Sequence, residues 1–335
     1  MSLRCFSVEK RQWHCGQRWY RRCRPGRFCG RFCAWNQTAG RRAMTDNLAA
    51  VGALGTVGLD PVSIIALAAI AIIGLPHGAF DGAVALALGY GKTLRSMFWF
   101  ILVYIAIAAC VVVFWVAFPV LALLLFLLIS MVHFGIGDSQ PGEWGHRTIQ
   151  TLAHGGLVVI AISLLHRTEV EPIFAHLLVG DTTIVWMVLS GAAYGLAVIV
   201  AGYAVLAYRC PVLRPRLGEL AALGAAYYVL PPLAGFALYF CAVHSMRHMT
   251  HIWRELRTGV EGGRKMLMLA FIFSLATWAA GAIALWLMPA AETLDGGILR
   301  VVFIGLAALT VPHMILVDGL FRSAPQASKR NSVLE

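Results

Sequence analysis

The stretch MFWFILVYIAIAACVVVFWVAFPVLALLLFLLISM, from Met97 to Met131, contains no Lys, Arg, Asp or Glu. A helix needs about 20 mostly apolar residues to cross the hydrocarbon core of a bilayer. This uncharged stretch is long enough for most of two such helices, which we place near 97–117 and 119–137. A soluble protein of this size could not hide so much uncharged surface, so the stretch predicts a membrane protein.

The composition of the whole chain agrees with this prediction. The chain of 335 residues is 59% hydrophobic and 13% charged, whereas soluble domains contain about 25% charged residues. Transmembrane β-barrels are excluded because their strands alternate between lipid-facing and lumen-facing residues, and these runs are too long and too uniformly apolar for that. We expect an all-α, polytopic transmembrane bundle with some helices kinked by Pro.

About eight spans are expected. They lie near 60–89, 97–117, 119–137, 148–166, 183–208, 232–256, 265–288 and 297–320, with a shorter apolar helix at about 217–230. Asp60 followed by Pro61 predicts the start of the first helix, because Asp is a favoured N-cap and Pro a favoured first helical residue.

The chain divides into a tail at 1–43, a transmembrane domain at 44–322 and a short polar tail at 323–335. Residues 1–43 hold 11 of the 27 Lys and Arg, one of the 16 acids and five of the eight Cys. Such a tail could contact anionic lipid or nucleic acid or hold a zinc knuckle, but it could equally precede the true start at Met44. We expect no nucleic-acid partner. The basic segments favour a cytoplasmic N-terminus.

Histidines within the apolar spans are the main functional signal, because polar residues inside a bilayer are costly and usually functional. His77 lies 16 residues after Pro61, His133 lies 14 after Pro119, and His244 lies 12 after Pro232. At about 1.5 Å per residue each is roughly 18–24 Å from its helix start. Antiparallel helices could therefore bring all three to one level near the middle of the membrane.

His244 and His248 are spaced i,i+4, which places both rings on one helical face. With His77 and His133 they could form a set of four nitrogen ligands around one metal. Gly78 and Gly135 would allow close approach of helices. Asp81 and Asp138 follow His77 and His133 by four and five residues, and could orient those rings. Imidazole suits iron, copper and zinc alike, so the ligand type leaves the metal open.

The other histidines are less informative. We interpret His154 as an interhelical hydrogen-bond partner and His251 as interfacial, and we place His146, His166 and His176 in loops. His313 is intramembrane, but a fifth protein nitrogen would compete with oxygen for the metal, so its role stays open. The aromatic residues Phe80, Phe134, Phe236, Tyr239 and Phe240 could line a substrate tunnel, although helix packing explains them equally well.

Four motifs resemble a known family. PHGAFD at 76–81, HFGIGD at 133–138, HSMRH at 244–248 and PHMILVD at 312–318 are similar in order and spacing to those of the Brp/Blh family of membrane beta-carotene 15,15'-dioxygenases. The resemblance covers about residues 60–320. Each motif is weak alone, and the combination is specific.

The resemblance implies that ferrous iron and O2 split beta-carotene at its central double bond to give two molecules of all-trans-retinal, which supplies a rhodopsin. The family's iron ligands correspond to His77, His133, His244 and His248, with no catalytic residue beyond these ligands and no organic cofactor. The protein would lie in the cell (cytoplasmic) membrane as a multi-pass protein. Its partners would be beta-carotene, O2, the lipid bilayer and a retinal-binding rhodopsin downstream.

Three other functions fit parts of the pattern. A di-iron membrane desaturase or hydroxylase would need about twice as many ligands, in several histidine clusters. A transporter with histidines along its path would have more intramembrane carboxylates than Asp81, Asp138 and Asp318. A non-catalytic helper that delivers retinal or assists rhodopsin assembly would need no iron.

Overall fold

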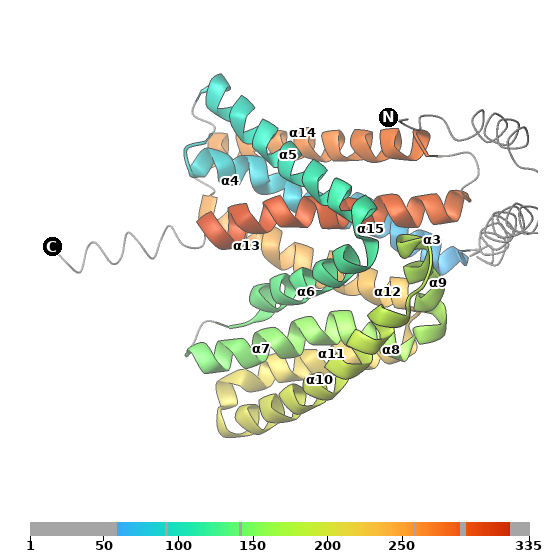
Figure 1. Ribbon diagram of the computed structural model, residues 1–335. Helices are drawn as coiled ribbons and strands as arrows, with labels where there is room; N and C mark the ends of the chain where they lie inside the picture. The colour runs from blue at the N-terminus through green and yellow to red at the C-terminus, as the bar shows by residue number, and fades with distance from the viewer. Residues whose placement is uncertain (1–58, 91–92, 141–142, 257–258, 289–292, 322–335) are drawn as a thin grey trace, which may run out of the picture. The chain divides into compact units, whose positions relative to one another are not determined.

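The computed structural model describes residues 59–90, 93–140, 143–256, 259–288 and 293–321. All the regular elements within these ranges are helices, as expected for an all-α bundle. The expected tails at 1–43 and 323–335 lie outside the described residues, and so does the proposed start at Met44. Figure 1 shows most of the long helices running roughly side by side.

In the labels that follow, α marks an α-helix and η marks a 3-10 or π-helical segment. The first half of the chain contains α3 (Pro61–Ala69), η1 (Ile70–Gly74), η2 (Leu75–Phe80), α4 (Asp81–Ala87), α5 (Leu94–Ala117), α6 (Pro119–Asp138), α7 (Trp144–Gly156), η3 (Leu157–Ala161), α8 (Ile162–Leu165) and α9 (Arg167–Leu178). The second half contains α10 (Thr183–Arg209), η4 (Pro211–Leu213), α11 (Arg214–Val229), α12 (Pro232–Ala237), η5 (Leu238–Ser245), α13 (Met246–Leu256), α14 (Gly259–Trp286), α15 (Leu294–Met314) and η6 (Ile315–Phe321).

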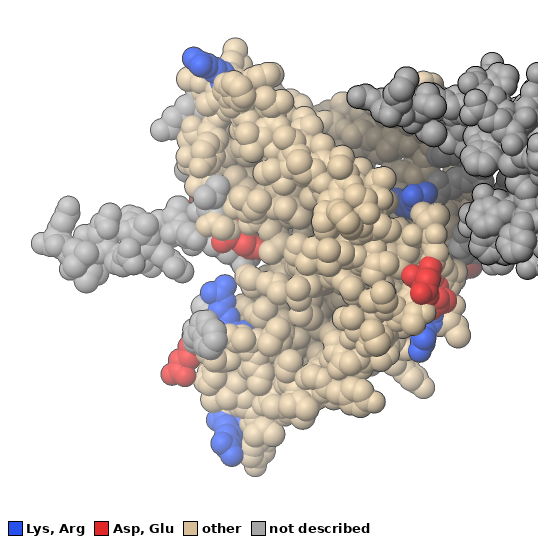
Figure 2. Space-filling view, in the orientation of Figure 1, with Lys and Arg blue, Asp and Glu red and all other residues tan. Residues whose placement is uncertain are grey.

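Seven of the described helical runs are long and apolar enough to cross a membrane. They are Pro61–Ala87, Leu94–Ala117, Pro119–Asp138, Gly145–Leu165, Thr183–Arg209, Gly263–Trp286 and Leu294–Gly319. Figure 2 shows charged side chains near the two ends of these helices, with an uncharged belt between them. This arrangement is that of a multi-pass membrane protein, because the belt can face hydrocarbon while the ends face water.

The expected eighth span, 232–256, is helical, but it is not among the seven described runs that are long and apolar enough to cross a membrane. Its first part, α12 and η5, is apolar, whereas α13 carries Arg247, Arg254 and Glu255. The mixture of an apolar and a charged half explains why counting apolar residues predicted one span too many.

The start of the first span is confirmed. The carboxylate of Asp60 accepts hydrogen bonds from the backbone N–H groups of Val62 and Ser63, at 2.8 and 3.0 Å, and Pro61 is the first helical residue.

The short helix expected at 217–230 is α11. One helix, α9, was missed, because Pro172 and several charged residues lower its apolar content. His146 in α7 and His176 in α9 are helical, so their placement in loops was wrong, whereas His166 does lie in the turn after α8.

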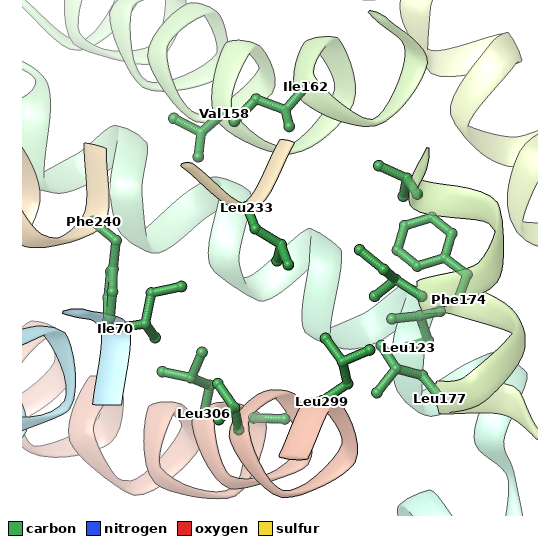
Figure 3. Packing of buried hydrophobic residues seen from close by; sticks show 14 of the residues in the cluster. Ile70, Leu123, Val158, Ile162, Phe174, Leu177, Leu233, Phe240, Leu299 and Leu306 are labelled. Atoms are coloured by element: carbon green, nitrogen blue, oxygen red, sulfur yellow. The ribbon is translucent and has the colours of Figure 1, made fainter. Parts of the chain in front are cut away.

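A core of apolar side chains holds the helices together. Figure 3 shows Leu123 of α6, Leu177 of α9 and Leu306 of α15 among the core side chains that lie between the helices. Inside a bilayer, apolar side chains can contact lipid tails as easily as each other. Helix association there depends instead on close van der Waals packing of this kind.

The crossing of α6 and α7 depends on two glycines. A Cβ atom at Gly135 would overlap the backbone carbonyl of Thr151, and one at Gly155 would overlap the carbonyl of Met131. The expected close approach of helices at Gly135 is therefore confirmed. At Gly78 it is wrong, since the nearest atom to an added Cβ there is Nδ1 of His313 at 4.0 Å, an ordinary contact.

We predict that Gly135→Ala destabilises the protein by about 1–3 kcal/mol, because an overpacked site forces the backbones apart. The measurement is thermal unfolding of the purified protein in detergent. Gly195→Ala is the matched control in α10, since an added Cβ there meets nothing within 4 Å. Equal melting temperatures for the two variants would contradict the close-crossing argument.

Candidate metal centre

Four histidines from three separate helical runs converge in the interior. They are His133 in α6, His244 in η5, His248 in α13 and His313 in α15. Their exposed fractions are 3%, 2%, 6% and 3%. The prediction that antiparallel helices bring His133 and His244 to one level is confirmed by their ring centroids, which lie 5.0 Å apart.

Each of the measured ring spacings lies within the range that two ligands of one metal ion can have. A ligating nitrogen about 2.1 Å from a metal puts its ring centroid roughly 3.2 Å away, so rings that share an ion lie no more than about 6.5 Å apart. The centroid of His313 lies 5.2 Å from that of His133 and 4.9 Å from that of His248. The centroid of His248 lies 6.4 Å from that of His133 and 6.2 Å from that of His244.

The i,i+4 pair behaves as predicted, since the rings of His244 and His248 are nearly parallel, at an interplanar angle of 9°. His244 lies in a π-helical segment, a distortion often found at functional sites. Among the described residues, no group of three or more His, Cys, Asp and Glu side chains is arranged so that it could hold a metal ion as it stands. The four imidazoles are nevertheless buried and adjacent to one another.

His77 belongs to η2, but its side chain lies outside the described part of the chain. The expectation that it is the fourth ligand therefore stays a prediction. His313, whose role the sequence left open, is the fourth histidine that the described residues bring to this point.

Two carboxylates hold two of the rings. Nδ1 of His133 lies 2.8 Å from Oδ2 of Asp318, and Nδ1 of His313 lies 2.8 Å from Oδ1 of Asp81. Tyr104 of α5 also donates to Asp81, at 2.8 Å. A ring that donates from Nδ1 to a carboxylate keeps Nε2 as its metal-binding nitrogen, and carboxylate–histidine–metal chains of this kind are common.

These pairs correct the sequence-based assignment of the carboxylates. Asp138 was expected to orient His133, but it accepts from Tyr239 at 2.6 Å and from Arg247 at 2.9 Å instead. The residue that orients His133 is Asp318. Since Asp318 lies five residues after His313 in PHMILVD, the motif was visible, but the sequence could not reveal that each carboxylate serves a histidine of another helix.

A chain of charges leads from Asp138 to the protein surface. Arg247 bridges Asp138 and Glu219, and Arg216 also binds Glu219, at 2.9 Å. Burial raises the pKa of Glu219, but the hydrogen bonds and charges of Arg247 and Arg216 lower it by more. The pKa of Glu219 therefore lies below its ordinary value. Glu219 therefore stays ionised. This row of charged side chains joins α6, α11 and α13 next to the histidines.

Aromatic side chains close one side of the cluster. Phe134, Phe236 and Phe240 line a small cavity with His133, and the rings of Phe236 and Phe240 are stacked at 5.4 Å. The other two aromatic residues do not line this cavity. Tyr239 is fully buried, with its ring beside Phe134 and His244 and its hydroxyl on Asp138, and Phe80 packs in a separate apolar cluster.

The remaining polar candidates lie outside the cluster of four rings. His154 is buried beside Tyr203, and its two ring nitrogens have no hydrogen-bond partner among the described residues, so its interpretation as an interhelical hydrogen-bond partner was wrong. His251 is exposed on α13. Cys241 donates from its thiol to the carbonyl of Ala69, at 3.4 Å.

We predict that Arg247→Met lowers the stability by about 1–3 kcal/mol, because it removes the cationic partner of the buried Asp138. The double variant Asp138→Asn with Arg247→Met should recover much of this loss, since the buried charge is removed as well. Thermal unfolding of the two variants and of Asp138→Asn alone measures the coupling. Additive effects would show that the pair does not matter.

Comparison with known proteins agrees with this arrangement. The family sequence model described as beta-carotene 15,15'-dioxygenase matches residues 68–321. The chain is 35% identical over 280 residues to the beta-carotene 15,15'-dioxygenase of an uncultured marine bacterium, 66A03, covering 82% of this chain and 98% of that protein. It is 27% identical over 313 residues to the probable beta-carotene 15,15'-dioxygenase Blh of Halobacterium salinarum, covering 82% and 90% of the two chains.

No solved structure matches the chain significantly. The matched residues include all the motifs that surround the buried histidines. The Brp/Blh resemblance noted in the motifs is thereby confirmed. The chain belongs to the beta-carotene 15,15'-dioxygenase family.

Proposed function

We propose that His77, His133, His244 and His248 hold a ferrous iron, and that the chain uses it with O2 to cleave beta-carotene at the central 15,15' double bond into two molecules of all-trans-retinal. The observation that carries the proposal is the convergence of His133, His244 and His248 in an apolar interior, within a chain of this family. His77 enters the proposal through the family resemblance alone.

The case for His313 as a ligand rests on the geometry of the cluster. Its ring stands as close to His133 and His248 as those rings stand to their other neighbours, and Asp81 fixes it as Asp318 fixes His133. We therefore include His313 as a further ligand. The His313→Ala variant described below tests the expected competition between His313 and oxygen.

The residues around the iron site have distinct tasks. Asp81 and Asp318 fix the tautomer and direction of two imidazoles. Phe134, Phe236 and Phe240 form an apolar wall that excludes water and offers flat surfaces to a polyene. Bound iron would supply the activation of O2 that carbon–carbon double-bond cleavage requires. Beta-carotene and oxygen both dissolve in lipid, so a site inside the bilayer meets both where they are concentrated.

We place the protein in the cell (cytoplasmic) membrane, where its retinal would be available to a retinal-binding rhodopsin. The rival functions are less well supported. In the described residues, Asp81, Asp138 and Asp318 bind His, Tyr or Arg side chains instead of forming a row of sites along a transport path. A non-catalytic helper would have no use for converging imidazoles, and the family match argues against a di-iron desaturase.

Expression in cells that accumulate beta-carotene tests the activity. We expect loss of orange colour and formation of retinal with the natural sequence. His248→Ala should abolish both cleavage and bound iron, because it removes one ligand from a buried site. Iron is measured by elemental analysis of the purified protein, and retinal by chromatography.

The matched control is His251→Ala, which changes an exposed histidine on the same helix α13. It should keep both iron and activity. The same measurements on His77→Ala and His313→Ala test the remaining two ligands. Unchanged carotene with iron, oxygen and protein all present would reject the activity, and full iron retention in His248→Ala would reject the ligand set.

Asp318→Asn should weaken iron binding about 10- to 100-fold while leaving the fold intact, because the carboxylate only orients His133. Iron affinity is measured by competition with a chelator, and folding by circular dichroism. Asp181→Asn, at an exposed helix start, is the control. Equal iron affinities in the two variants would show that Asp318 has no role at the centre.

A further inference from the structure

An apolar groove lies between α5, α6 and α15, away from the charged ends of these helices. Its volume is about 490 Å³. Its mostly apolar lining comes from all three helices and includes Val103, Ala106 and Trp115 of α5, Leu125 and Phe126 of α6, and Thr310 of α15. Val103 and Leu125 are 54% and 39% exposed on helices that cross the bilayer, so the groove opens toward lipid.

The groove adjoins the small cavity at the histidine cluster. Phe126 and Thr310 line both the groove and the small cavity that contains His133. The hydroxyl of Thr310 donates to the carbonyl of Leu306 at 2.7 Å, so its hydrogen is already used within α15. The side chains between the groove and His133 are therefore mostly apolar, with aromatic rings at the inner end.

The groove has the dimensions of a long, thin ligand. Its lining residues on α5 run from Val103 to Trp115, which is about 18 Å along the helix axis. Those on α5 recur every three or four residues and so form one face of that helix. A ligand that already dissolves in lipid gains little from burial alone, so selection here depends on shape and van der Waals contact.

We propose that this groove admits beta-carotene from the bilayer and holds one arm of the polyene while its central double bond lies at His133. The inference rests on the proposed function. A molecule cut at its centre needs an arm directed away from the metal on each side, and the groove offers apolar space for one. A lipid acyl chain could enter the outer part, but it would have no reason to extend past Phe126 to the histidines.

We expect that side chains that fill the groove block substrate binding without disturbing the histidines. Ala106→Trp adds a large ring to an exposed position in the groove. Ala109→Trp adds the same ring to an exposed position of α5 that does not line the groove. Leu125→Trp inside the groove and Leu128→Trp outside it form a second matched pair on α6.

Binding is measured on the purified full chain in lipid nanodiscs without oxygen, so that the substrate is not consumed. Beta-carotene is achiral, and its visible absorption band gains circular dichroism only when a chiral protein site holds it. We expect Ala106→Trp and Leu125→Trp to reduce this signal at least tenfold, while Ala109→Trp and Leu128→Trp leave it unchanged. Bound iron should be the same in all four variants, and retinal formation should follow the binding signal.

The outcomes separate this inference from the proposed function. If the unchanged chain cleaves beta-carotene and the groove variants bind and cleave it as their controls do, the groove holds only lipid and the inference is overturned. If the signal depends on the groove but no retinal forms when oxygen and iron are supplied, the groove stands and the proposed function fails. Should one groove variant fold poorly, the other pair decides.

Discussion

Polar groups inside a bilayer can find partners only in the protein, because hydrocarbon offers no hydrogen bonds. Around the histidine cluster the constraint is met by pairing across helices. Asp318 holds His133, and Asp81 holds His313 while accepting from Tyr104. Each carboxylate thus follows one histidine in sequence and binds another in space, so α4, α5, α6, α15 and η6 are linked around the same buried point.

A buried carboxylate beside the cluster is paired in the same way. The charge of Asp138 is balanced by Arg247, which reaches it from the polar end of α13. The apolar half of the same helical run carries His244 into the interior. One run therefore carries both a buried histidine and the counter-charge of Asp138, which lowers its apolar content below that of the seven candidate spans.

The sequence revealed the helical class and most of the spans because uncharged runs as long as that between Met97 and Met131 permit no other fold. It also revealed the convergence of His133, His244 and His248, since proline starts and i,i+4 spacing fix depth and direction along a helix. It could not reveal partners between helices. Asp138 was assigned to His133 from proximity in sequence, whereas the rotation of α6 turns it toward Tyr239 and Arg247.

The central claim is that imidazoles bind iron in the membrane interior, and X-ray absorption spectroscopy at the iron edge of the purified full chain tests it most directly. The account predicts a shell of nitrogen or oxygen neighbours with the outer-shell scattering pattern of several imidazole rings. That pattern should weaken in His248→Ala and stay unchanged in His251→Ala. A shell containing sulfur, or one without imidazole scattering, would contradict the account.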